Sequence, residues 1–238
     1  MIENLKVFTN DKKPTNDIIF LHGYLSSSNA FYKQKEFLQR DFNLWFLDLK
    51  GFGDNLNMEY PYSLNDYVDE VKEYAYKNSL RRPNVIAHSF GGRIAIKIAS
   101  SQEDFFNKLV LTGCAGLKPK NTIKKFVKKS CFNILKPFVK KEKLRCFYSK
   151  DYLSLSPVMQ QSFIKVVNEH LDEYISNIKN QTLLIFGKND KQTPLYMAKK
   201  LNEQIINSKL IVFEDAGHFA FIDCPMKFNL EVKEFLLS

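Results

Sequence analysis

The sequence of 238 residues predicts an α/β fold, with a mostly parallel central sheet, helices on both faces and an inserted helical cap. Three observations predict it. Short apolar runs alternate with longer amphipathic stretches, the runs are continuously apolar, and about seventy residues after the fourth run lack any strand pattern. Continuous apolar runs are typical of strands buried on both faces, as in a parallel sheet.

Six apolar runs are the expected strands. Each holds three or four consecutive hydrophobic residues. They are Ile18–Leu21, Leu44–Leu47, Val85–Ala87, Leu109–Leu111, Leu183–Phe186 and Leu210–Phe213.

Helical patterns lie between these runs. Ser63, with Asp66 three residues later, predicts a capped helix whose apolar residues are Leu64, Tyr67, Val68, Val71 and Ala75. Further helices are expected around 94–99, 197–205 and 228–235. Strand–helix alternation of this kind implies an open sheet with right-handed crossovers.

The long insertion is expected to form the cap. We assign residues 1–115 and 180–238 to the core and 116–179 to the cap. Asn121–Val139 is amphipathic and basic, and Ser156-Pro157 begins a second helical region. The apolar side of that region comprises Met159, Phe163, Val166, Val167, Leu171 and Ile175. A cap over the carboxyl edge of the sheet would cover the edge at which such sheets bind ligands.

Composition excludes several classes of protein. The chain is 45% hydrophobic and 26% charged, which argues against disorder. No signal-peptide pattern begins at Met1, and no run of about 18 apolar residues predicts a membrane span, so the expected location is the cytoplasm. The four cysteines form no C-x-x-C pair, so neither a zinc site nor a thioredoxin-like site is expected. The chemistry that the other motifs of the chain indicate needs neither a metal nor an organic cofactor. A Cys131–Cys146 disulfide stays open, although reduced thiols are the expected cytosolic state.

Positive charge is concentrated in one segment. The chain carries a net charge of +9, whereas residues 116–150 alone, with eleven Lys and one Arg against Glu142, carry +11. A local basic island differs from the uniformly basic, module-bearing chains that bind nucleic acid, so no nucleic-acid partner is expected. Three interpretations of the basic cap, 118–150, remain. They are a lid with solvated lysines, a surface for anionic membranes, and a surface for an acidic carrier protein.

The strongest chemical signal is Ala87–Gly92, with the sequence Ala-His-Ser-Phe-Gly-Gly. It follows an expected strand and opens an expected helix, which is the context of a nucleophile elbow. The tight turn would expose the hydroxyl of Ser89, and small residues on both sides would let strand and helix pass closely. Ala87 stands where glycine is usual.

A serine hydroxyl needs a base, and the chain has four histidines. His218 follows Gly217 just after the last expected strand, so we assign it as the base. His170 lies in the expected cap. The side chain of His88 should point away from the Ser89 hydroxyl, and His22 is expected to shape its loop.

Asp190 is the expected acid, because it ends the fifth strand and gives the chain order Ser, Asp, His. Asp215 is the competitor, and its expected role is to cap a turn.

The backbone N–H groups of Phe90 and Tyr24 are the expected oxyanion donors, from the nucleophile helix and the loop after the first strand.

These motifs together resemble the α/β-hydrolase superfamily, and within it the capped, serine esterase-like members. The matching pieces, in family order, are His22–Tyr24, Asp48–Gly53, Ala87–Gly92, Gly187–Asp190 and Ala216–His218. The resemblance implies a triad of Ser89, Asp190 and His218, with Tyr24 and Phe90 as oxyanion donors. It also implies that Asp48 belongs to a structural turn.

The resemblance implies hydrolysis of carboxylic esters, or thioesters, of small to medium acyl groups. Expected pocket residues are His22, Leu25, Phe126 and Phe219. Alternatives are a lyase of the menaquinone-pathway type, a carbon–carbon hydrolase and a non-catalytic binding module. Carbon–carbon hydrolases usually carry Gly-Asn-Ser at the elbow and Trp after the histidine, unlike this chain, and the filled triad argues against the binding module.

Overall fold

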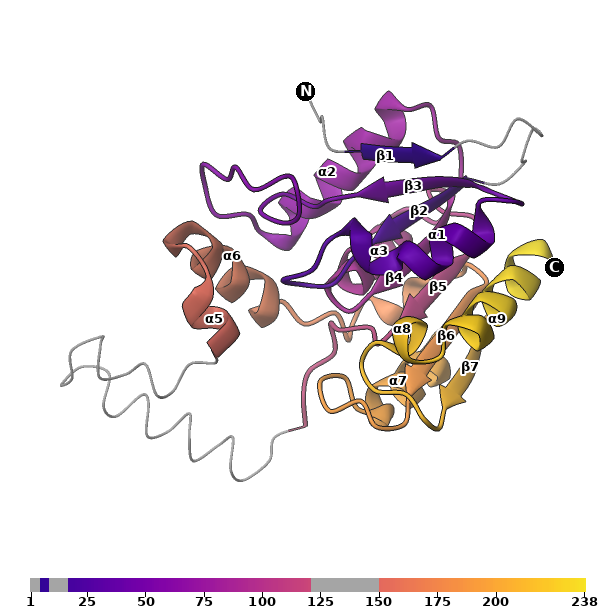
Figure 1. Cartoon of the computed structure of the whole chain (residues 1–238). Coiled ribbons are helices and arrows are strands. Elements are labelled where there is room, and N and C mark those ends of the chain that lie inside the picture. Colours follow the sequence, from indigo (N-terminus) through magenta and orange to yellow (C-terminus); the bar gives the residue numbers. More distant parts are fainter. Residues whose placement is uncertain (1–4, 9–16, 121–149) are drawn as a thin grey trace.

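The computed structural model describes residues 5–8, 17–120 and 150–238, and these form a central sheet flanked by helices (Figure 1). The strands follow the order β1-β3-β2-β4-β5-β6-β7. Their bounds are β1 Leu5–Phe8, β2 Asp17–Leu21, β3 Asn43–Leu47, β4 Asn84–His88, β5 Leu109–Thr112, β6 Thr182–Gly187 and β7 Ser208–Phe213. β2 to β7 are parallel, which confirms all six expected strands.

One strand was not expected. β1 pairs antiparallel with β3 at the edge of the sheet, with Leu5 opposite Leu47. Its sequence, Leu-Lys-Val-Phe, is short and interrupted by a charge, so it lacks the continuous apolar run of the buried parallel strands.

Helices cover both faces of the sheet. They are α1 Tyr32–Leu38, α2 Leu64–Lys77, α3 Phe90–Ser101, α5 Lys150–Ser154, α6 Pro157–Asn168, α7 Leu195–Gln204, α8 Ala220–Asp223 and α9 Pro225–Leu237, with 3₁₀ turns η1 Ser28–Phe31 and η3 Ile175–Asn177. Buried residues of α2, α3 and α7 share one hydrophobic cluster, and those of α1, α8 and α9 share the other. The sheet is therefore the middle of three layers.

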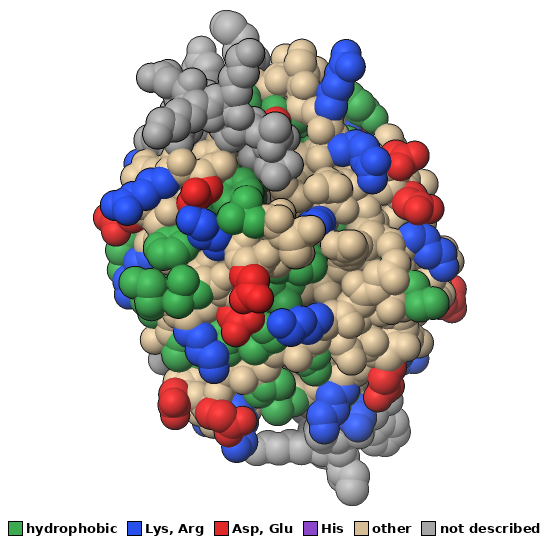
Figure 2. Space-filling model, turned by 90° about the vertical axis from the view of Figure 1, so that its right-hand side faces the viewer, with side chains coloured by type: hydrophobic (Ala, Val, Ile, Leu, Met, Phe, Trp, Pro, Cys, Tyr) green, Lys and Arg blue, Asp and Glu red, His purple; other side chains and the backbone are tan. Residues whose placement is uncertain are grey.

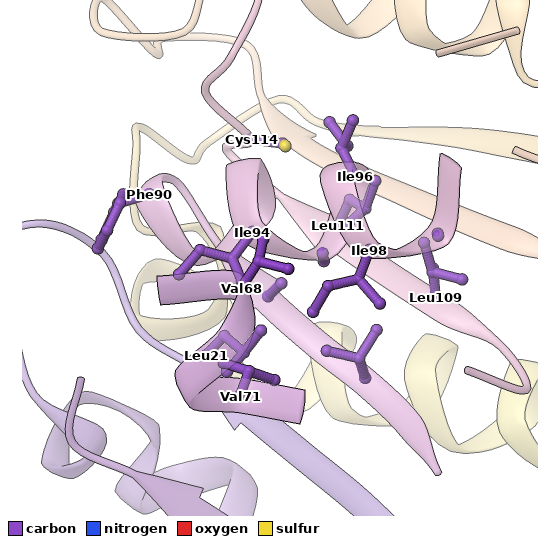
Figure 3. Packing of buried hydrophobic residues seen from close by; sticks show 14 of the residues in the cluster. Leu21, Val68, Val71, Phe90, Ile94, Ile96, Ile98, Leu109, Leu111 and Cys114 are labelled. Atoms are coloured by element: carbon purple, nitrogen blue, oxygen red, sulfur yellow. The ribbon is translucent and has the colours of Figure 1, made fainter. Parts of the chain in front are cut away.

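β2 shows why a strand in the middle of this sheet has a continuous apolar run: its side chains are buried on both faces. Ile19 and Leu21 belong to the cluster under α2 and α3, whereas Ile18 and Phe20 belong to the cluster under α1 and α9. All four side chains are fully buried. Figure 3 shows the first cluster, with side chains of α2 and α3 packed together over the strands.

Local capping explains where two helices begin. Ser63 Oγ accepts a hydrogen bond from Asp66 N, and Asp66 Oδ2 accepts one from Ser63 N at 2.6 Å, which is the expected capping box of α2. Ser156 caps α6 by accepting from Met159 N, and Pro157 occupies the first turn as expected.

The second cap helix is shorter than the apolar pattern predicted. α6 ends at Asn168, so Leu171 and Ile175 lie outside it. Both are nevertheless fully buried, because the chain turns after Glu169 and runs back against the core. Burial outside α6 produced the misleading pattern, since Leu171 lies in no helix and Ile175 begins the separate 3₁₀ turn η3.

The described part of the insertion contains α5, α6 and η3, and none of its described residues forms a strand. α6 lies beyond the carboxyl ends of the parallel strands (Figure 1). Residues 121–149 lie outside the described segments, and with them the expected helix at 121–139, Phe126 and the Cys131–Cys146 pair. The cap boundaries remain a prediction.

Surface charge is mixed where it can be seen. Figure 2 shows one face, from the side on which α9 lies in Figure 1, with basic, acidic and hydrophobic side chains interspersed. Within the described segments, no helix is long and apolar enough to cross a membrane.

Candidate active site

The turn between β4 and α3 holds Ser89 in a strained conformation. Its φ of 49° and ψ of −105° lie outside the regions that non-glycine residues favour. A Cβ at Gly91 would lie 2.2 Å from the carbonyl oxygen of Leu21, and one at Gly92 would lie 2.3 Å from Cys114 Sγ. Backbone atoms therefore leave room only for glycine at Gly91, and Gly92 packs closely against the Cys114 side chain, as in a nucleophile elbow packed tightly against its sheet.

Backbone hydrogen bonds fix this turn to the neighbouring strand. Ser89 N donates to Thr112 O, and Ser89 O accepts from Ala115 N, both at 3.1 Å. The strain at Ser89 is thus maintained by the surrounding sheet.

His218 and Asp190 meet at the same edge of the sheet. His218 Nδ1 lies 2.8 Å from Asp190 Oδ2, and their side chains are 7% and 0% exposed. Asp190 follows β6 and His218 follows β7, so adjacent parallel strands deliver both. Asp215, the competing acid, is exposed to solvent after β7. The carboxylate that lies within hydrogen-bond distance of the imidazole is that of Asp190.

Thr193 completes the environment of the acid. Its hydroxyl donates to Asp190 Oδ2 at 2.6 Å, while its backbone N–H and that of Gln192 donate to Oδ1 at 2.9 and 2.8 Å. Burial raises the pKa of Asp190, but the hydrogen bonds from His218 and Thr193 outweigh it and hold that pKa below its usual range. Asp190 is therefore a charged, immobilised acceptor.

The turn that carries Ser89 and the turn that carries His218 are in contact through His88. Its Nε2 lies 3.0 Å from His218 O, and the two imidazole centroids are 4.7 Å apart. Among the described residues, no hydrogen bond joins the Ser89 hydroxyl to His218. Such bonds are often long in ligand-free sites and tighten when substrate binds.

Two backbone N–H groups are available near Ser89. Phe90 is the first residue of α3, so its N–H has no acceptor within the helix. Tyr24 lies in the loop after β2. This loop is bonded to the turn at Ser89, because Gly91 N donates to His22 O at 3.0 Å. A Cβ at Gly23 would lie 3.4 Å from Ser89 Cβ, so this loop passes close to Ser89.

Comparison with known proteins identifies the family. The family model described as alpha/beta hydrolase fold matches residues 17–130 and 127–225. The chain belongs to the α/β-hydrolase family. This confirms both the expected fold and the resemblance drawn from the sequence.

Relatives cover nearly all of this α/β hydrolase. An AB hydrolase superfamily protein of Bacillus subtilis, YisY, is 26% identical over 98% of this chain and 96% of its own. A pimeloyl-[acyl-carrier protein] methyl ester esterase of Nitrosomonas europaea is 23% identical, over 89% of this chain and 92% of its own. The structure of the esterase EaEST from Exiguobacterium antarcticum is similar in fold, with a TM-score of 0.78, 24% identity, and coverage of 98% and 95%.

One expected pocket residue of this α/β hydrolase is corrected. His22 is fully buried, its Nε2 accepts from Leu49 N at 3.1 Å, and its Nδ1 donates to Gly23 O at 2.8 Å. Both ring nitrogens bond to backbone groups, and burial lowers the pKa of the ring, so His22 links the loop after β2 to the segment after β3 and presents no exposed surface to a pocket.

The other expected pocket residues have different outcomes. Leu25 is half-exposed, with a φ of 56°. Phe219 is 37% exposed and lies against the imidazoles of His88 and His218. Phe126 lies outside the described residues. For Leu25 and Phe219, a contact with substrate remains a prediction.

The structural turn is as the resemblance implied. Asp48 Oδ1 accepts from Ser28 N at 2.7 Å, and Oδ2 accepts from Asp54 N at 2.9 Å. Its carboxylate thus accepts hydrogen bonds from two loop segments and holds the turn.

Three residues were missed as supports of the site. They are Thr193 beside Asp190, His88 beneath His218, and Arg93, whose guanidinium donates to Val166 O and Glu169 O of the cap. Only Thr193 had a usable signal, since a Thr three residues after an Asp is a common local hydrogen-bonding pattern.

In the described segments, no group of three or more His, Cys, Asp or Glu residues is arranged to hold a metal.

Proposed function

We propose that this α/β hydrolase cleaves carboxylic esters of small to medium acyl groups through Ser89, His218 and Asp190. The observation that carries the proposal is the 2.8 Å hydrogen bond between His218 Nδ1 and Asp190 Oδ2 at the sheet edge that also presents the strained Ser89. A carboxylate on Nδ1 fixes the tautomer that leaves Nε2 free to accept the serine proton.

The reaction then proceeds through an acyl-enzyme. Ser89 Oγ attacks the ester carbonyl carbon while His218 Nε2 takes the hydroxyl proton. His218 gives that proton to the leaving alcohol as the carbon–oxygen bond breaks. Water, deprotonated by His218, attacks the acyl-enzyme, and the proton returns to Ser89 as the carboxylic acid departs.

The developing oxyanion needs fixed donors. We assign this role to the backbone N–H groups of Phe90 and Tyr24, the first of which also lies at the positive end of the α3 dipole. Loss of one such donor typically costs about 3 kcal/mol of transition-state stabilisation. Because both donors are backbone N–H groups, a side-chain substitution does not remove them. It can only displace them by changing the geometry of the loop.

A relative's chemistry extends the proposal. The Nitrosomonas relative is named for cleaving a methyl ester carried on acyl-carrier protein. An acidic carrier suits the basic segment 118–150 of this chain, whose charge also suits an anionic membrane surface. We propose the carrier-bound ester, or thioester, as the second substrate class to examine.

The test is hydrolysis of p-nitrophenyl esters from acetate to long-chain acyl. Wild type should turn over short and medium esters. Ser89→Ala should lower kcat at least about 10⁴-fold, because the nucleophile is lost. Ser101→Ala, at the exposed end of the same helix, is the control and should match wild type.

Two results would count against the proposal. If Ser89→Ala kept wild-type turnover, the nucleophile would be misassigned. If wild type cleaved none of the esters, carrier-bound esters and an isochorismate-derived carboxylate would be the next substrates, and turnover of the latter alone would favour the lyase.

A further inference from the structure

His88 is a buried histidine that the triad leaves unused. It is the last residue of β4, directly before Ser89, and it is 1% exposed. Its Nε2 lies 3.0 Å from the main-chain oxygen of His218. A carbonyl oxygen only accepts hydrogen bonds, so Nε2 must carry the hydrogen and His88 must donate.

The surroundings of His88 fix its ring. Its centroid lies 4.7 Å from that of His218, 4.9 Å from that of Phe219 and 5.0 Å from that of Phe221. On the other side, a Cβ at Gly23 would lie 2.8 Å from Nδ1, so only glycine leaves room for the ring there. Burial, and then the neighbouring His218, lower the pKa of His88 to about 3, so the imidazole is neutral at physiological pH.

The turn that carries His218 is held at several points. Asn189 N donates to Ala216 O at 3.0 Å, and Gly217 N donates to Asp223 Oδ2 at 2.8 Å. At His218 itself, Asp190 holds the imidazole and His88 holds the main chain. Neither bond uses Nε2 of His218, which is the nitrogen that would accept the serine proton in the proposed function.

We propose that His88 is a positioning residue that sets the distance between His218 and Ser89. The inference rests on the proposed function and adds a residue to it. His88 is joined to Ser89 by a peptide bond and to His218 by a hydrogen bond, so these two links connect nucleophile and base. A displacement of about 1 Å between reacting groups can cost on the order of 100-fold in rate.

Two variants separate the hydrogen bond from ring packing. His88→Phe keeps an aromatic ring against Phe219 and Phe221 but removes the donor. His88→Gln removes the ring but places an amide N–H₂ near the position of Nε2. His170→Gln, at an exposed cap residue, is the matched control.

The measurement is kcat per active site, with sites counted by titration with a fluorophosphonate, so that misfolded protein does not enter the rate. We expect His88→Phe to lower kcat per site about 10- to 100-fold with KM within about threefold. His88→Gln should stay within about fivefold of wild type in kcat. The inference fails if His88→Phe keeps the wild-type kcat per site, or if His88→Gln loses as much as His88→Phe.

A second measurement needs no catalysis. Nitrogen-15 NMR of the histidine rings should show His88 with its hydrogen on Nε2, and the opposite tautomer in wild type would overturn the inference without any variant. In His88→Phe, the proton shared by His218 and Asp190 should shift, whereas an unchanged signal would overturn the inference. If wild type cleaves no ester, the proposed function fails, but these spectra still decide the role of His88.

Discussion

At the scale of single residues, the site depends on how completely Asp190 is satisfied. Its carboxylate accepts four hydrogen bonds, from His218, the Thr193 hydroxyl and the N–H groups of Gln192 and Thr193. A buried carboxylate without such partners would be protonated at neutral pH. In the proposed mechanism, Thr193 therefore maintains the charge and orientation of the acid.

Replacing Thr193 with Val should lower the free energy of unfolding by about 1–3 kcal/mol at pH 7, because a buried charged acceptor loses one donor. The folded pKa of Asp190 lies below its unfolded value of about 4, so its stabilising contribution is full above that value and is lost as pH falls through the folded pKa. The difference between variant and wild type should therefore shrink at pH 3. Urea unfolding at both pH values measures it.

Thr193→Ser provides the comparison, because it keeps the hydroxyl and removes a methyl group. It should retain most of the stability and of kcat/KM. A Thr193→Val deficit that stayed equal at pH 7 and pH 3 would show that lost packing, rather than the hydrogen bond to Asp190, is responsible.

At the scale of elements, α6 is anchored to the core at several places. Tyr24 OH donates to Met159 O at 3.2 Å, and Tyr62 N donates to Ser162 Oγ at 2.8 Å. Arg93 of α3 donates to Val166 O at 3.0 Å and to Glu169 O at 2.8 Å, where the helix ends. A cation at the carboxyl end of a helix also complements its dipole.

Arg93→Met should release the end of α6. Glu169 O loses its bond from Arg93, and Val166 O keeps only its bond from Glu169 N, so the free energy of unfolding should fall by about 1–3 kcal/mol. Tyr24, whose N–H is a proposed oxyanion donor, contacts α6 through Met159 O and the ring of Phe163. A displaced α6 should therefore disturb substrate binding, so that KM for medium-chain esters rises more than kcat falls. Urea unfolding and ester kinetics measure both effects, with exposed Arg81→Met as the control. Wild-type stability and KM in Arg93→Met would contradict the anchoring role.

Elements differ in how far they could be predicted. The six parallel strands and the capping box of α2 were predictable, because burial on both faces and local capping leave signals within a few residues. β1 was not, because an edge strand is specified by its partner β3. The end of α6 was missed because Leu171 and Ile175 are buried although both lie beyond that helix.

The same distinction applies to the candidate site. Ser89, Asp190 and His218 could be nominated because each sits in a recognisable strand-end motif. The burial of His22, and the contact of His88 with His218 across 130 residues, depend on how distant segments pack. No short sequence window contains that information.

At the scale of the whole molecule, stability comes from a sheet buried on both faces. Phe20 of β2 is fully buried, with its ring 4.3 Å from Phe46 and 5.2 Å from Phe31, on the face opposite α3. The carboxyl edge of the sheet, where the candidate site lies, is supported by this core. The ring contacts given for Phe20 are with Phe31 and Phe46, neither of which is a candidate site residue, so packing at Phe20 and chemistry at Ser89 should be separable.

Phe20→Ala should lower the free energy of unfolding by about 3–5 kcal/mol, because it leaves a cavity in a closely packed layer. Leu237→Ala, at a residue 57% exposed near the end of α9, should change it by less than about 0.5 kcal/mol. In the folded fraction of Phe20→Ala, kcat per titrated site should remain near wild type. A cost below about 1 kcal/mol would contradict the role of this layer.

The most direct test of the account is covalent labelling with a fluorophosphonate, located by mass spectrometry of the intact protein and its peptides. Native wild type should gain one adduct, on Ser89, whereas heat-denatured wild type and Ser89→Ala should gain none, because only a serine activated by His218 reacts. Native protein that takes up no label, or takes it up on another residue, would contradict the claim that Ser89 is the nucleophile of a serine hydrolase.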